Sequence, residues 1–228
     1  MLRLILGRAG TGKTALLFSE IAARCARRQS GSFLIVPEQY SHEAERELAQ
    51  RCGDTASLYA EVLSFSRLAH RVAIGCGGSA RVYIDKPGRF LQLSLALEQV
   101  GGALSVYGGS ARSPERMVQL LSALDELRFG CTAPDALRKA AESATPSLAG
   151  KLRDLALLQE ALDALSAQSG ADPAGRLDVL AEQLPGCAWL RSAKFYIDGF
   201  TDFTAQERRV IRALLPLSLI HISEPTRH

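Results

Sequence analysis

Short apolar runs alternate with helical patterns in the first third of the chain. Three runs have the length of buried strands: Leu2–Leu6, Ser32–Val36 and Leu58–Leu63. Apolar positions at helical spacing follow each run: as far as Arg28, over Ser41–Cys52 and over Ser64–Ile74. Strands that alternate with helices in this way predict a parallel sheet that is covered by helices on both faces.

The pattern changes after residue 85 and changes back near residue 190. In between, leucines recur every three or four residues, as on the buried face of a helix, and strand signal is almost absent. A strand signal returns at Lys194–Asp198, and Thr204 with Glu207 has the spacing of a capping box for a last helix. We therefore predict one α/β domain, residues 1–85 and 190–216, interrupted by an all-helical insertion, residues 86–189.

Composition excludes several classes of protein. The 228 residues are 47% hydrophobic and 22% charged, with a net charge of +3, which is typical of a globular chain and not of a polybasic nucleic-acid binder. No apolar run is long enough for a membrane-spanning helix, and the N-terminus does not resemble a signal peptide, so we expect a cytoplasmic protein without membrane contact. The cysteines are widely and irregularly spaced, which predicts reduced thiols and neither a zinc site nor a disulfide framework: Cys25, Cys52, Cys76, Cys131 and Cys187.

The last twelve residues, 217–228, read LSLIHISEPTRH. This string resembles the translation of a sequencing-library adapter. We expect it to be non-native and leave it out of the functional argument. On that interpretation the chain is the N-terminal part of a larger protein.

One motif indicates nucleotide chemistry, since it fits G-x-x-x-x-G-K-[ST]: Gly7, Arg8, Ala9, Gly10, Thr11, Gly12, Lys13 and Thr14. Its glycines allow successive backbone N–H groups to surround a polyphosphate at the start of a helix. Lys13 is expected to reach the β- and γ-phosphates of ATP, and the Thr14 hydroxyl is expected to bind Mg²⁺. Because a strand precedes the motif and a helix follows it, the predicted fold is that of a RecA-like P-loop NTPase.

Asp198, at the end of the strand that begins at Lys194, is the candidate for the second group at this site. We expect it to hold Mg²⁺ through a water molecule. Active ATPases usually place a glutamate directly after this aspartate, whereas this chain has Gly199, which can neither accept a proton nor hold a water by a side chain. The sequence predicts a site that binds ATP and hydrolyses it poorly.

Three further blocks give the chain a family resemblance. They are Val36–Tyr40 with Ala44–Arg46, Ser64–Leu68, and Tyr196–Thr204. With the phosphate loop, they resemble a degenerate UvrD-like superfamily 1 helicase motor, and more closely the N-terminal region of the AddB family of helicase–nuclease subunits.

The resemblance implies a function in double-strand break repair by recombination. An AddB subunit works with an AddA-like helicase subunit on single-stranded DNA from a double-strand end and recognises the Chi signal. It carries a nuclease with an iron–sulfur cluster in a C-terminal region that lies beyond this sequence. The chain alone is therefore expected neither to unwind nor to cut DNA. The candidate DNA contacts are Ser64, Phe65, Ser66, Arg67 and Arg71, with Phe65 stacking on a base and the arginines meeting phosphates.

Other interpretations remain open at this point. Phe65 can instead belong to the core, and the two arginines can be a solvated helix face. The whole chain can be an independent P-loop ATPase or kinase with a helical lid, or a scaffold subunit that retains a relic nucleotide site.

Overall fold

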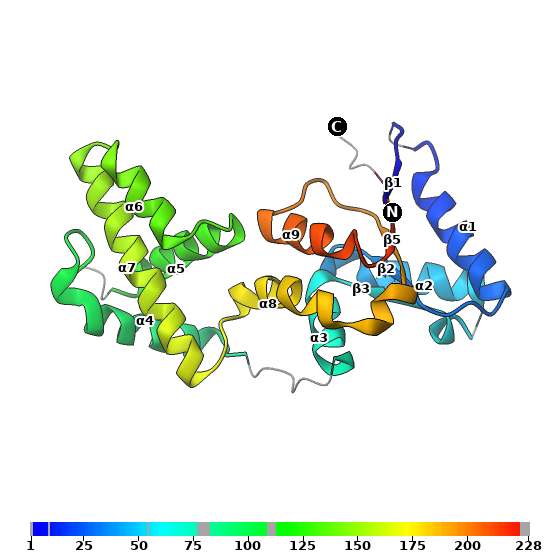
Figure 1. The fold of residues 1–228 in the computed structure, drawn as a ribbon, viewed down its shortest axis with the longest axis horizontal. Coiled ribbons are helices and arrows are strands. Elements are labelled where there is room, and N and C mark those ends of the chain that lie inside the picture. The colour runs from blue at the N-terminus through cyan, green and yellow to red at the C-terminus, as the bar shows by residue number, and fades with distance from the viewer. Residues whose placement is uncertain (1, 9, 54, 77–82, 109–112, 224–228) are drawn as a thin grey trace. The chain divides into compact units, whose positions relative to one another are not determined.

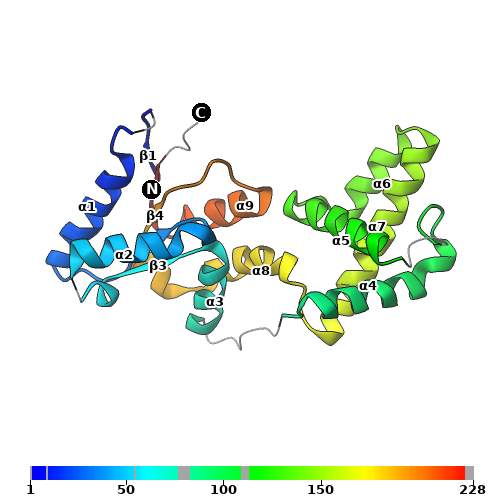
Figure 2. The same cartoon turned by 180° about the vertical axis from the view of Figure 1, so that it is seen from behind.

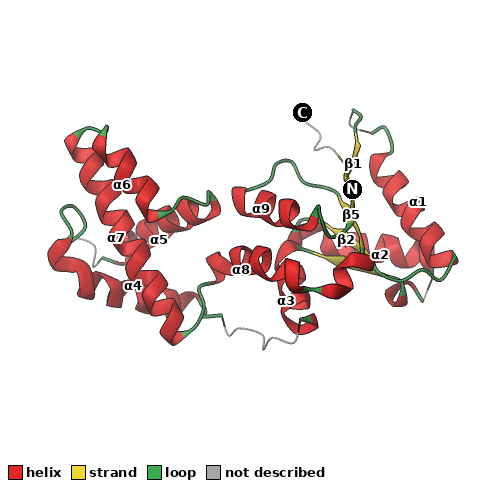
Figure 3. Cartoon of the chain, in the orientation of Figure 1, coloured by secondary structure: helices red, strands yellow, loops and turns green. Residues whose placement is uncertain are grey.

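The first and last parts of the chain together form a parallel sheet (Figures 1 and 3). The computed structural model describes residues 2–8, 10–53, 55–76, 83–108 and 113–223. Within these residues the sheet has five strands in the order β1-β5-β4-β2-β3, all parallel. The strands are β1 (Leu2–Ile5), β2 (Ser32–Ile35), β3 (Ala60–Leu63), β4 (Lys194–Ile197) and β5 (Leu219–Ser223).

Helices make up most of the remainder. The α-helices of the described residues are α1 (Lys13–Ala26), α2 (Ser41–Cys52), α3 (Phe65–Gly75), α4 (Lys86–Val100), α5 (Pro114–Phe129), α6 (Pro134–Glu142), α7 (Pro146–Ser169), α8 (Arg176–Gln183) and α9 (Ala205–Leu214). Short 3₁₀ helices lie at Glu38–Tyr40, Ala56–Leu58, Gly101–Ala103, Pro173–Gly175, Leu184–Gly186 and Ala188–Ser192. The predicted capping box is confirmed, because Thr204 and Glu207 exchange both hydrogen bonds at the start of α9.

Successive residues of each inner strand enter opposite cores, as the period of two along a strand requires. On one face, Leu34, Val62 and Tyr196 pack with the apolar sides of α1 and α2. On the other face, Phe33, Phe195 and Ile220 belong to a larger cluster that includes residues of α3, α8 and α9. The prediction of an α/β fold with a parallel sheet covered on both faces is confirmed.

The chain divides into two compact units. The first comprises Met1–Ala80 and Leu177–His228, and the second comprises Arg81–Arg176. The sequence pattern predicts a longer helical insertion, residues 86–189. In the structure α8 and the two turns after it belong with the sheet, because Leu180, Leu184 and Leu190 are buried in the core beneath the strands. No helix among the described residues is long and apolar enough to cross a membrane.

The second unit is a helical bundle of α4, α5, α6 and α7 (Figure 2). Its core contains Leu93, Leu121 and Leu158. One buried carboxylate, Asp154 on α7, accepts hydrogen bonds from the backbone N–H groups of Ser105, Val106 and Tyr107 and from the Ser105 hydroxyl, at 2.7–3.0 Å. These bonds fasten the connection between α4 and α5 to the longest helix of the bundle.

The segment that resembles an adapter translation takes an inner position in the sheet. Leu219–Ser223 form β5, which pairs with β1 on one side and with β4 on the other. Its Ile220 and Ile222 are buried on one face and His221 on the other. Residues 224–228 lie outside the described residues. An alternating apolar segment fills a strand position whatever its origin, so the non-native origin of the tail stays a prediction.

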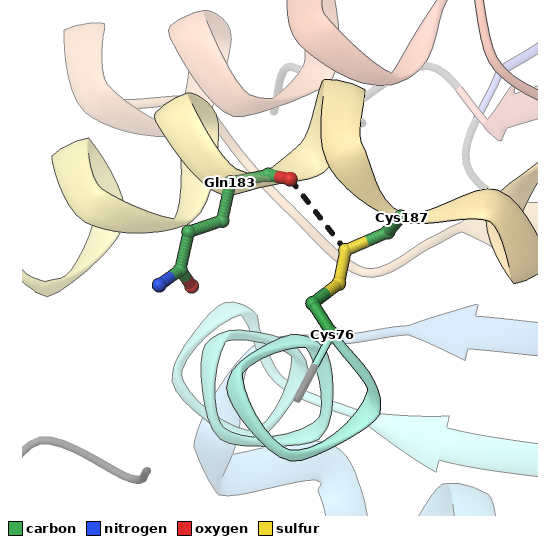
Figure 4. Close-up of a disulfide and its surroundings, with 3 residues drawn as sticks. All are labelled: Cys76, Gln183 and Cys187. Carbon is green, nitrogen blue, oxygen red and sulfur yellow. Dashed lines mark hydrogen bonds between the residues drawn. A yellow bond between two sulfur atoms is a disulfide. The ribbon is translucent and has the colours of Figure 1, made fainter. Parts of the chain in front are cut away.

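The cysteine prediction is wrong for one pair. Cys76, at the end of α3, forms a disulfide with Cys187, which follows α8 (Figure 4). The two are 111 residues apart, so their spacing carries no signal of a local pair. Cys25 and Cys52 remain thiols. Burial is the main cause that raises the pKa of Cys52, to about 11, and the neighbouring Cys25 side chain is the second.

Candidate functional site

Every predicted site segment follows a strand at the same edge of the sheet. Because all described strands are parallel, their carboxyl ends share one edge, which is where open α/β sheets bind ligands. The loop Gly7–Gly12 comes after β1, and Asp198 comes after β4. The segment Ser64–Arg67 comes after β3, and the Val36–Tyr40 block comes after β2. The fold therefore places four separate motifs at one edge.

The loop after β1 has a backbone that requires its glycines. Gly10 and Gly12 have φ angles of 75° and 85°, in the left-handed region that favours glycine. A Cβ atom on Gly7 would lie 2.6 Å from the Thr11 hydroxyl oxygen, so a side chain there would force the Thr11 side chain to move and lose its hydrogen bond to the Arg8 carbonyl. Gly12 is the N-cap of α1, which begins at Lys13. The loop thus leads directly into a helix N-terminus, whose free N–H groups and dipole favour an anion.

The Lys13 side chain turns back over the loop. Its Nζ donates to the carbonyl oxygens of Gly7 and Arg8, at 2.5 and 3.1 Å. The hydroxyl of Thr11 also donates to the Arg8 carbonyl, at 2.8 Å. Thr14 lies exposed in the first turn of α1. Ala9 lies outside the described residues. The ammonium group therefore lies against the start of the loop, at Gly7 and Arg8.

Asp198 lies at the end of β4, with β5 between it and β1. Two strand spacings separate the carboxyl ends of β1 and β4, or roughly 10 Å. That gap suits a hydrated cation between a phosphate on the loop and a carboxylate on β4. Asp198 is buried, its backbone N–H donates to the Ile35 carbonyl, and its carboxylate accepts a hydrogen bond from the Ser223 hydroxyl. Ser223 belongs to residues 217–228, the segment that resembles an adapter translation.

Gly199, the residue directly after Asp198, has a backbone φ of 78°. A Cβ atom there would lie 3.4 Å from Cδ of Pro37 and 3.9 Å from the ring of Tyr40. The contact with Pro37 is ordinary, so the obstacle to a side chain at this position is the left-handed backbone.

Phe65 is a core residue, which corrects its assignment as a base-stacking residue. It is 5% exposed, and its ring packs on Phe200 with a centroid distance of 5.5 Å. Phe200 in turn packs on Phe203, at 4.9 Å. Phe65 is therefore packed within the core, with Phe200 on one side of it, and has no exposed ring face for a base in this conformation.

The other candidate DNA contacts lie in the first two turns of α3. Ser64 is buried and serves as N-cap, accepting from the Arg67 N–H at 3.2 Å, and Ser66 is half-buried. Arg67 pairs with Glu45 at 2.6 Å. Arg71 lies 3.4 Å from Glu61 and over the ring of Trp189. Exposed ion pairs contribute at most about 1 kcal/mol, so a phosphate can displace them, and a DNA role for these residues stays a prediction.

Sequence reasoning missed three groups at this edge. Ser223 falls in the tail that resembles an adapter translation. Pro37 and Tyr40 stand out in the sequence only as part of a family block, although they border the Gly199 backbone. Asp198 directly follows β4, and Pro37 comes two residues after the end of the adjacent β2. These positions could have linked the two residues, because adjacent parallel strands end side by side. Within the described residues, no group of three or more His, Cys, Asp or Glu side chains is arranged to hold a metal ion.

Comparisons with known proteins agree on one family. A family model described as "ADDB, N-terminal" matches residues 4–221. Similar proteins include an ATP-dependent helicase/deoxyribonuclease subunit from Desulforamulus reducens, 38% identical over 220 residues, and its counterpart from Heliobacterium modesticaldum, 39% identical over 221 residues. The matches cover 94% of this chain but only 19% and 18% of those proteins. The chain thus spans about a fifth of the length of the relatives it matches.

Proposed function

The chain belongs to the AddB family, in its N-terminal region, and from this premise we propose that it is the ATP-binding, DNA-engaging part of a helicase–exonuclease subunit in double-strand break repair. The subunit acts with an AddA-like helicase on single-stranded DNA from a double-strand end. In the parent complex the same activity resects the end and responds to Chi. The chain itself binds ATP with Mg²⁺ and turns it over poorly.

The observation that carries this proposal is the loop after β1. Gly7, Gly10 and Gly12 each have a steric or backbone reason to be glycine, and Lys13 lies against the loop. Loop N–H groups and Lys13 would hold the phosphates of ATP, while Thr14 and Asp198 would hold Mg²⁺, the latter through water. The bound metal would neutralise phosphate charge. Gly199 provides no group to activate water.

Binding and turnover measured together test the proposal. Calorimetry should detect ATP binding to the whole chain with Mg²⁺ present, while phosphate release stays near the rate of a blank without protein. Robust turnover by the isolated chain would instead favour the independent ATPase. An absence of binding would favour the scaffold with a relic site.

Replacing Gly199 with glutamate is expected to leave turnover near background. A left-handed backbone costs a non-glycine residue about 1–2 kcal/mol, so the new side chain shifts the loop instead of extending into the site. Gly199→Ala controls for that backbone cost, and both variants should lower the thermal midpoint by a similar amount. Phosphate release is the readout. A tenfold or greater gain in Gly199→Glu alone would show that this one side chain is all the site lacks.

The double variant Arg67→Ala/Arg71→Ala is expected to weaken binding of a single-stranded oligonucleotide and to flatten its salt dependence. Each lost phosphate contact reduces the slope of log K against log salt by about 0.7, or about 1.4 for the pair. Fluorescence anisotropy at several salt concentrations measures the slope. Arg138→Ala is a control, because Arg138 is also an exposed, ion-paired arginine but lies in the helical unit. An unchanged slope in the double variant would remove both residues from the interface.

A further inference from the structure

The Cys76–Cys187 disulfide joins a residue that precedes the helical unit in the chain to a residue that follows it. Cys76 ends α3, shortly before the second unit begins at Arg81. Cys187 follows α8, shortly after the first unit resumes at Leu177. Their Cα atoms are 5.6 Å apart, a common separation for a disulfide. The covalent loop that this bond closes therefore contains the whole helical unit.

The two sulfurs are in different surroundings. Cys76 is exposed, whereas Cys187 is 2% exposed. The carbonyl oxygen of Gln183 lies 3.5 Å from the Cys187 sulfur (Figure 4). If the disulfide is reduced, the new S–H group of Cys187 can donate a hydrogen bond to this carbonyl oxygen. The buried thiol would therefore not be left without a hydrogen-bond partner. Cys76 is thus the more accessible of the two residues, and a Cys187 thiol would have a hydrogen-bond acceptor beside it.

The disulfide also lies beside a stacked contact between α3 and the turn Ala188–Ser192. The Trp189 ring lies 5.1 Å from the Arg71 guanidinium and 5.4 Å from the Phe33 ring. Gly75 lies so close that a Cβ atom there would be 2.7 Å from Trp189 Nε1. Trp189 is the single tryptophan of the sequence and lies two residues from Cys187. Any release of this turn from α3 therefore changes the surroundings of one fluorescent side chain.

We propose that Cys76–Cys187 is a redox-reversible clamp that holds together the two chain segments leading into and out of the helical unit. In reduction, a thiolate of a dithiol attacks the Cys76 sulfur and breaks the bond to Cys187. The Cys187 thiolate leaves and takes up a proton. The second thiolate of the dithiol then displaces Cys76, so the clamp gains two electrons and the dithiol becomes a disulfide. Oxidation by a disulfide such as oxidised glutathione reverses these steps. The reduced state frees the turn that carries Trp189 from the end of α3.

The experiment is a redox titration of the folded chain with dithiothreitol and its oxidised form. Differential alkylation and mass spectrometry should show Cys76 and Cys187 becoming accessible together in native buffer. Trp189 emission should change over the same range and return on reoxidation. Hydrogen exchange at the end of α3 and over residues 184–192 should speed up at least about tenfold, with the strands unchanged.

Two variants complete the test. Cys76→Ser alters an exposed position and should give the reduced-state emission and exchange under all conditions, while Cys131→Ser, outside the disulfide, should titrate as the wild type does. In Cys76→Ser the thermal midpoint should fall by roughly 5–15 °C, as expected for opening a loop of about 110 residues in a chain of this size. Three results would overturn the proposal: both cysteines alkylated under oxidising conditions, reduction only after unfolding, or reduction with emission and exchange unchanged.

Discussion

Lys13→Ala is expected to weaken binding of ATP with Mg²⁺ by roughly 10- to 150-fold. A hydrogen bond to a charged group contributes about 1.5–3 kcal/mol, and each 1.4 kcal/mol is a factor of ten in affinity. Lys13 Nζ already lies within 3.1 Å of two loop carbonyls, so little ordering is needed to turn it toward a phosphate. Arg8, the other cation of the loop, remains in the variant and is exposed. Calorimetric titration with ATP at fixed Mg²⁺ measures the effect.

Lys139→Ala is the matched control, because it removes an exposed lysine from the helical unit and leaves the loop intact. Its affinity for ATP should equal that of the wild type. The thermal midpoint of Lys13→Ala without nucleotide should also stay close to the wild-type value, since the lost contacts are on the surface. If Lys13→Ala binds ATP as tightly as the wild type, the nucleotide is not held by this loop, and the proposed site is wrong.

The parts of the fold and site that depend on local pattern could be predicted from the sequence. Four apolar runs correspond to β1, β2, β3 and β4, and Gly10 and Gly12 of the loop after β1 have the left-handed backbone that favours glycine. Asp198 lies at the end of its strand as predicted, because strand length and the turn residues after it are local signals.

Features that depend on distant contacts were not predictable in this way. Phe65 lies between two serines, and it is buried in a core cluster that includes Phe200 and other residues far along the chain. The helical unit ends at Arg176 because the apolar side of α8 packs beneath the sheet, and a helical pattern does not say which core it will join. The pairing of Cys76 with Cys187 follows only from the path of the chain around the second unit.

Asp154→Ala is expected to lower the free energy of unfolding of the helical unit by about 3–5 kcal/mol. The substitution leaves three backbone N–H groups and a hydroxyl without their acceptor at a site where the aspartate is 1% exposed. Unsatisfied buried donors cost about 1–3 kcal/mol each, partly offset where water enters. Chemical denaturation of the whole chain, followed by circular dichroism, measures the loss. Asp163→Ala is the control on the same helix, since its half-exposed ion pair with Arg128 contributes at most about 1 kcal/mol.

The same carboxylate predicts how stability depends on pH. Burial by itself raises the pKa of Asp154. The three backbone hydrogen bonds and the bond from the Ser105 hydroxyl together lower it by more than burial raises it, so the pKa lies below the ordinary value of 3.8. A lowered pKa means that the folded state favours the charged form. The contribution of Asp154 to the free energy of unfolding is therefore complete above the pKa that this group has in the unfolded chain. It is lost as the pH falls through the pKa of the folded state. The wild type should lose stability on acidification below about pH 4, and the Asp154→Asn variant should lose less over that range. Equal slopes in the two proteins would show that a different group controls acid unfolding.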